Sequence, residues 1–182
     1  MKLYEYFNKM KGSTRGSPPR VSNQEIFWSW IGAFLGISAV AWLDHFYFEG
    51  SDLSLMVGSL GASSVLIYGA IRSPMAQPRN LLGGHFLSAV IGVSCWKLLH
   101  QYPWLAEAMA VATSIAVMHA TKTLHPPAAA TALIAVAGSP AIHHAGYLYV
   151  LVPATISPLV LLLVALLVNN IPASRRYPEI WF

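Results

Sequence analysis

The stretch His125-Pro126-Pro127-Ala128-Ala129-Ala130-Thr131-Ala132-Leu133-Ile134 decides the fold of this chain, because an earlier stretch matches it. That stretch, Gly58-Ser59-Leu60-Gly61-Ala62-Ser63-Ser64-Val65-Leu66-Ile67, lies 67 positions before it. At this shift Ser64 aligns with Thr131, and the pair Leu-Ile recurs in both stretches. Apolar segments that Gly or Pro interrupts at matching places in two halves of a chain indicate a transporter's binding site.

The composition places the rest of the chain in a membrane. Of the 182 residues, 55% are hydrophobic and 10% are charged, whereas soluble domains carry about 25% charged residues. Between Thr123 and Ser174 there is no Lys, Arg, Asp or Glu. A soluble surface cannot be built from such a stretch, so we predict an integral protein of the lipid bilayer. The net charge of +4 fits basic residues beside a membrane and does not suggest nucleic acid.

Apolar segments predict an all-α domain over residues 26–170, between a basic cytoplasmic tail (1–25) and a cytoplasmic C-terminal tail (171–182). About 20 helical residues cross a hydrocarbon core near 30 Å thick. One segment is short, because a helix over 127–138 reaches only about 18 Å. The six segments are 26–43, 53–71, 81–99, 104–120, 127–138 and 148–168.

The distribution of charge favours a full crossing by the short segment over a re-entrant loop. With six crossings and a cytoplasmic N-terminus, ten of the 11 Lys and Arg residues lie on the inner side. Asp44, Glu49 and Asp52 then lie outside, as the positive-inside rule requires. We expect an inner (plasma) membrane of bacterial type, with both termini in the cytoplasm.

The 67-residue shift also aligns 81–99 with 148–166, which gives two halves, about 26–100 and 104–168. Each half has three segments, so the two halves must face opposite ways across the membrane. This pattern predicts an inverted repeat with Gly/Pro-interrupted second helices and a substrate site near the bilayer midplane. The alternative is chance similarity between alanine-rich helices.

The interrupted helices supply candidate anion ligands. Helix breaks at Gly58 and Gly61, and at Pro126 and Pro127, would each begin a new helix, whose first N–H groups lack internal partners and carry partial positive charge. Small neighbouring residues would let a small anion approach these amides. The hydroxyls available to it are those of Ser59, Ser63, Ser64 and Thr131. The alternative is that small residues only permit close helix packing.

Cations and histidines near these breaks are the other candidates. The planar guanidinium of Arg79 suits a small oxyanion, and Lys122 is a second candidate; both are otherwise positive-inside anchors. His125 could donate to an anion, carry a proton or cap a helix, and His85 is a weaker candidate for a proton relay. Cys95 is the single cysteine and the histidines lack metal-site spacing, so we expect no metal and no other cofactor.

Four ordered blocks resemble the HPP family of integral membrane proteins over about residues 26–170. The blocks are Gly58–Ala62, Ser73–Asn80, Gly83–His85 and Thr123–Leu133. The resemblance implies a transporter-like protein, and nitrite transport as in plastid and cyanobacterial members. It also implies that the motifs Pro78-Arg79-Asn80 and His125-Pro126-Pro127 form part of the site.

The function expected from these observations is membrane transport of a small anion, most of all nitrite, through a channel or a carrier. The first alternative is a non-transporting assembly or regulatory subunit. An enzyme is not expected, because no Ser-His-acid arrangement is apparent. A homo-oligomer is also expected, for which Gly32-x-x-x-Gly36 offers a helix-pairing face.

Overall fold

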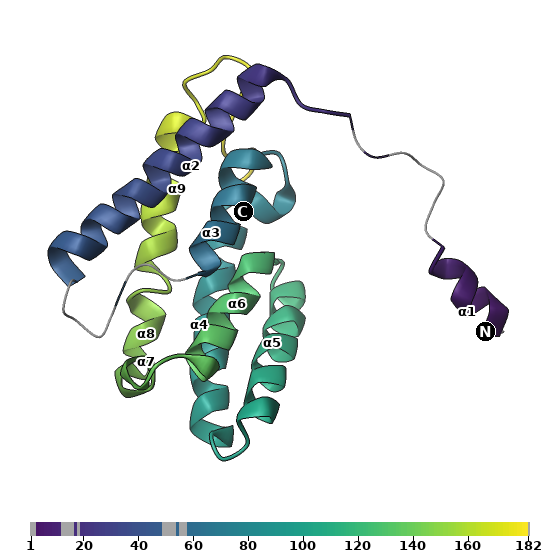
Figure 1. Cartoon of the computed structure of the whole chain (residues 1–182), viewed down its shortest axis with the longest axis vertical. Helices are drawn as coiled ribbons and strands as arrows, with labels where there is room; N and C mark the ends of the chain where they lie inside the picture. The colour runs from purple at the N-terminus through teal and green to yellow at the C-terminus, as the bar shows by residue number, and fades with distance from the viewer. Residues whose placement is uncertain (1–2, 12–16, 18, 49–53, 55–57, 182) are drawn as a thin grey trace.

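In the computed structural model, the described residues are 3–11, 17, 19–48, 54 and 58–181, and they form helices and turns with no strand among them. Figure 1 shows α1 apart from the rest, while the other helices pack side by side. In chain order, the elements are α1 (Leu3–Lys9), α2 (Asn23–Leu43), the π-helical segment η1 (Asp44–Phe48), α3 (Ser59–Ser64), the π-helical segment η2 (Val65–Gly69), the short 3₁₀ helix η3 (Pro74–Ala76), α4 (Pro78–Leu99), α5 (Pro103–Ala120), α6 (Pro126–Ala137), α7 (Pro140–Ala145), α8 (Leu148–Leu151) and α9 (Ile156–Val168).

Within the described residues, three segments are long and apolar enough to cross a membrane: Asn23–Phe48, Pro78–Leu99 and Leu148–Val168. Ser59–Gly69 and Pro126–Ala137 are shorter apolar helices. This pattern of long apolar helices supports the predicted class, an all-α membrane protein. Glu49, Asp52 and the start of the predicted segment 53–71 lie outside the described residues.

Two local predictions of helix structure are wrong. Gly61 does not break a helix, because it lies inside α3, and a Cβ added there would meet nothing within 4 Å. The segment 148–168 is not one helix, because α8 ends at Leu151 and α9 begins at Ile156. Pro153 lies in this gap, where its missing N–H prevents the continuous ladder of helical hydrogen bonds.

Helix α4 lies at the centre of a three-helix group with α5 and α6. A Cβ on Gly84 would lie 3.3 Å from that of Ala128, and one on Gly92 would lie 2.8 Å from that of Ala135. The later residue of α4, Gly92, meets the later residue of α6, Ala135, so the two helices run in the same direction. The absence of side chains at these two glycines lets the backbones of α4 and α6 approach closely.

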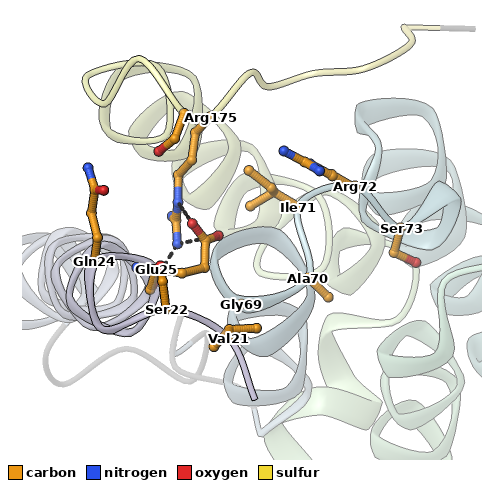
Figure 2. Close-up of a pocket in the computed structure, with 11 residues that line it drawn as sticks. Val21, Ser22, Gln24, Glu25, Gly69, Ala70, Ile71, Arg72, Ser73 and Arg175 are labelled. Carbon is orange, nitrogen blue, oxygen red and sulfur yellow. Dashed lines mark hydrogen bonds and ion pairs between the residues drawn. The ribbon is translucent and has the colours of Figure 1, made fainter. Parts of the chain in front are cut away.

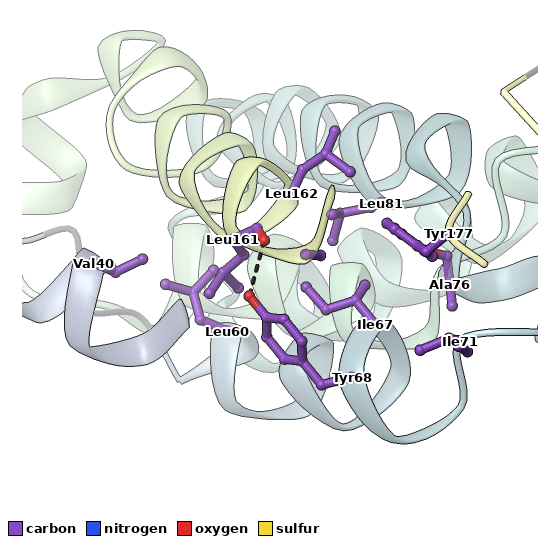
Figure 3. Packing of buried hydrophobic residues seen from close by; sticks show 11 residues of the cluster. Val40, Leu60, Ile67, Tyr68, Ile71, Ala76, Leu81, Leu161, Leu162 and Tyr177 are labelled. Atoms are coloured by element: carbon purple, nitrogen blue, oxygen red, sulfur yellow. Dashed lines mark hydrogen bonds between the residues drawn. The ribbon is translucent and has the colours of Figure 1, made fainter. Parts of the chain in front are cut away.

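A second group of helices encloses Tyr68, on η2, against α2 and α9. The Tyr68 hydroxyl donates to the carbonyl oxygen of Leu161 at 2.9 Å, as Figure 3 shows. A Cβ on Gly32 would lie 2.5 Å from the Tyr68 ring, and one on Gly36 would overlap the phenol end. The Gly32-x-x-x-Gly36 face is therefore filled by a tyrosine of the same chain and is not free to pair two copies.

Replacing Gly36 with alanine is expected to lower the unfolding free energy by about 1–3 kcal/mol, the usual cost of overpacking a core. The Gly61→Ala variant is the matched control, because a Cβ there meets open space and alanine favours a helix over glycine. Thermal unfolding of the purified proteins in detergent measures both changes. Equal unfolding temperatures for the two variants would contradict the packing of Tyr68 on α2.

The C-terminal residues fold back over the end of the bundle where α2 begins. Arg175 is buried beside Glu25, with 2.8 Å between Nη2 and Oε1, as Figure 2 shows. The Tyr177 hydroxyl donates to the carbonyl of Ala76 at 2.7 Å, and the Glu179 amide donates to Gln77 Oε1 at 2.9 Å. The segment predicted as a tail is thus anchored to the bundle up to at least Glu179.

Candidate functional site

Five polar side chains from three helices meet in the interior. We call them the polar cluster: Ser59 and Ser63 of α3, His85 of α4, His125 just before α6, and Thr131 within α6. Each is at most 1% exposed. Helices α3 and α6 run antiparallel beside one another, since the first residue of α3 contacts Thr131 while Ser63 contacts His125.

The cluster is a continuous chain of hydrogen bonds. Ser63 Oγ lies 2.9 Å from Nε2 of His85 and 2.9 Å from Nε2 of His125. On the far side of His85, Nδ1 lies 2.7 Å from Oγ1 of Thr131, which donates to Ser59 Oγ at 3.0 Å. The two imidazole rings are tilted by 55°, with their centroids 5.1 Å apart. One serine therefore bridges two buried imidazoles.

His125 does not cap α6, although it occupies the residue before the first turn. Its side chain makes no capping hydrogen bond, and its Nδ1 instead lies 2.7 Å from the carbonyl oxygen of Met75. The Met75 loop is held by Gln77, whose Nε2 donates to the carbonyls of Ile71 and Ser73, both at 2.9 Å. The orientation of the His125 ring thus depends on a loop far away in sequence.

The predicted cradle of helix amides is not present at the start of α6. Pro126 and Pro127 have no N–H, and the Ala128 amide donates to the His125 carbonyl at 2.9 Å. The first three positions therefore offer no amide to an anion. The N-termini of α3 and α6 also point in opposite directions rather than converging.

The predicted cations lie in a separate cleft of about 320 Å³ at the end of the bundle. We call this the cationic cleft; its lining residues are Pro74, Gln77, Arg79, Asn80, Lys122, Ile180 and Trp181. Arg79 Nη2 donates to the Thr121 carbonyl at 2.7 Å, and Asn80 Nδ2 donates to the Leu124 carbonyl at 2.9 Å. Lys122 is exposed. The cleft is thus lined by two cations, Arg79 and Lys122.

The polar cluster and the cationic cleft share two backbone loops. Residues 121–125 pass from the Arg79 contact to His125, and residues 74–77 pass from the cleft wall to the Met75 carbonyl. A displacement of either loop therefore changes the geometry of both the polar cluster and the cationic cleft. Ser64, another predicted ligand, is buried outside the cluster, and its Oγ has no hydrogen-bond partner in the described part of the chain.

Three contributors to the site were missed by sequence reasoning. The Met75 carbonyl carries no signal in the sequence because every residue has one. Gln77 lies inside a quoted motif, yet nothing in the motif shows that its amide fixes the loop. Tyr149, which donates to the carbonyl of Thr131 at 3.0 Å, lies in a run of apolar residues that predicts only a membrane segment.

The fold and the cluster together define a class: a helical membrane protein with a buried series of hydroxyl and imidazole side chains, carried by the short helices α3 and α6 and the long helix α4. The chain belongs to the HPP family, since the family model described as "HPP, transmembrane region" matches residues 18–178. Over 187 aligned positions, it is 42% and 39% identical to two transmembrane proteins of Dictyostelium discoideum. The alignments cover the whole chain but 60% and 65% of these relatives. No solved structure matches the chain.

Proposed function

We propose that this protein transports a small anion across a membrane, with nitrite as the favoured substrate. The main support is the polar cluster, because buried polar groups in a membrane domain are expensive and mark substrate or proton pathways. The cationic cleft supplies attraction for an anion at one end. The preference for nitrite rests on the resemblance of the sequence motifs to the HPP family, whose plastid and cyanobacterial members are associated with nitrite transport.

The proposed pathway runs from the cationic cleft past His125 and Ser63 toward Thr131 and Ser59. Arg79 and Lys122 would concentrate the anion, and the hydroxyl and imidazole donors would replace its hydration shell as it passes. We further propose six crossings, an inverted repeat of the two halves and cytoplasmic termini, which the positive-inside rule supports. The cleft then opens to the cytoplasm.

Replacing Arg79 with glutamine is expected to lower nitrite flux about three- to tenfold, because one of the two cations in the cleft is lost. Flux is measured in vesicles that contain the purified protein, with protein-free vesicles as the blank. The Arg72→Gln variant is the matched control, since Arg72 lines a different cleft beside Glu25 and Arg175. A wild-type flux equal to the blank for nitrite, nitrate, formate, chloride and bicarbonate would contradict anion transport.

The second candidate is a non-transporting subunit that assembles with another membrane protein or with a second copy. One observation favours it: an open apolar groove of about 490 Å³ lies where α3 and η2 meet α6. Its lining residues are Ala62, Val65, Leu66, Pro126, Pro127 and Ala130. Flux by the purified chain alone would decide for transport, because an assembly subunit moves no solute by itself.

A further inference from the structure

Hydrogen-bond directions in the polar cluster fix which ring nitrogen of each histidine carries a proton. Nδ1 of His125 faces the Met75 carbonyl at 2.7 Å, and a carbonyl oxygen only accepts, so Nδ1 must be protonated. In the neutral ring, Nε2 of His125 then carries a lone pair and no proton, and it faces Ser63 Oγ.

The same reasoning applies to His85. The single hydroxyl proton of Thr131 is directed to Ser59 Oγ, so Thr131 accepts from Nδ1 of His85. In the neutral ring, Nε2 of His85 therefore also carries a lone pair and no proton, and it faces the same Ser63 oxygen at 2.9 Å.

Ser63 has one hydroxyl proton and two imidazole lone pairs to satisfy. We propose that His85, Ser63 and His125 form a site that binds one extra proton, and that this proton crosses the membrane together with the anion. With the extra proton on one Nε2, that nitrogen donates to Ser63 Oγ, and the Ser63 hydroxyl donates to the other ring. Every hydrogen bond of the bridge is then made. The coupling to an anion rests on the proposed transport function, whereas the proton site does not.

A second proton would place two positive rings about 5 Å apart in the interior, so the site takes one. The transfer step is balanced. When imidazolium His125 gives its Nε2 proton to Ser63 Oγ, the original Ser63 proton passes to Nε2 of His85. One N–H bond breaks, one forms, and Ser63 keeps a single proton throughout.

Among the described residues, the elements around the bridge offer the extra charge no free carboxylate, since Glu25 on α2 is paired with Arg175. The described ranges of α3, η2, η3, α4, α6, α8 and α9 contain no Asp or Glu. Tyr149 faces Thr131, and Tyr68 faces away toward Leu161. Arg79 and Lys122 lie in the cationic cleft. Lys97 lies in the last turn of α4 and Glu107 near the start of α5, at the end of the bundle away from that cleft. Because an unpaired buried charge is costly, a small anion would supply the counter-charge that the described residues do not give the protonated bridge.

The proton site is tested by ¹⁵N NMR of histidine-labelled full-length protein in lipid nanodiscs, titrated with acid. The His85→Gln and His125→Gln variants assign the signals. We expect neutral rings protonated at Nδ1, and one proton taken up jointly by the two rings. In Ser63→Ala the joint step is lost and proton binding weakens at least tenfold. The control is Ser114→Ala, since Ser114 is also buried and its hydroxyl has no hydrogen-bond partner among the described residues.

A neutral His85 protonated at Nε2, or two rings that titrate independently in the wild type, would overturn the proton site. Coupling is tested in vesicles by recording internal pH during nitrite uptake, against protein-free vesicles. We expect about one proton for each nitrite. Nitrite flux without protons would overturn coupling and leave transport standing. A shared proton without flux of any tested anion would overturn transport and the coupling that rests on it, and leave the proton site standing.

Discussion

Glu25→Ala is expected to lower stability more than the other single changes that we propose. Removing the carboxylate leaves the Arg175 guanidinium, whose side chain is 1% exposed, without its counter-ion. Breaking a buried ion pair by removing one partner costs about 3–5 kcal/mol, and the 28% exposure of the Glu25 side chain puts this pair at the low end of that range. At about 3 kcal/mol, the apparent unfolding temperature of a protein of this size falls by roughly 6–12 °C. Thermal unfolding of the purified protein in detergent measures the change.

The structure explains why this pair matters. Arg175 also donates to the Glu25 carbonyl and to Ser29 Oγ, each at 2.8 Å, and to Asn169 Oδ1 at 3.1 Å. These bonds join the start of α2 to the chain that leaves α9, two regions about 150 residues apart.

Two controls separate the ion pair from a general loss of charge. Glu107→Ala removes a carboxylate from α5 that has no described ion pair, and Arg176→Ala removes the exposed cation next to Arg175. Both are expected to stay within about 1 °C of the wild type, because isolated surface charges contribute little. The double variant Glu25→Ala/Arg175→Ala should lose less stability than the two single losses added together. A Glu25→Ala variant as stable as Glu107→Ala would refute the role assigned to the pair.

The helices were predictable from the sequence where apolar length and proline punctuation agree. Pro126 begins α6 as expected, because proline suits the first turn of a helix. Pro153 carried the same kind of signal, but the apolar run around it hid the break between α8 and α9. Gly61 shows the opposite error, because a glycine in a helix interior lowers helix propensity without ending the helix.

The members of the polar cluster were predictable as residue types but not as a set. Hydroxyls and histidines beside helix breaks indicated a polar interior, and His85, Ser63 and His125 do meet there. Their order in the chain of hydrogen bonds depends on tertiary contacts, above all on the loop that presents the Met75 carbonyl. The role given to the helix amides at the start of α6 failed because two of its first three positions are prolines.

The largest functional effect that we expect concerns the Ser63 bridge between His85 and His125. It is the loss of nitrite flux in His125→Gln. A glutamine amide can bond to either the Met75 carbonyl or Ser63 Oγ, but it cannot bind the extra proton. Leaving a buried partner unsatisfied costs about 1–3 kcal/mol, so flux should fall roughly five- to 150-fold.

The dependence of flux on pH separates loss of the proton site from loss of the fold. Wild-type flux should rise as the pH falls, because transport requires the protonated bridge, whereas the residual flux of His125→Gln should not respond. His119→Gln is the matched control, since His119 is exposed at the end of α5 and should keep wild-type flux and pH response. Thermal unfolding establishes that each variant is folded. A folded His125→Gln protein with the wild-type pH dependence would remove this histidine from the mechanism, and with it the reason for a serine between two buried imidazoles.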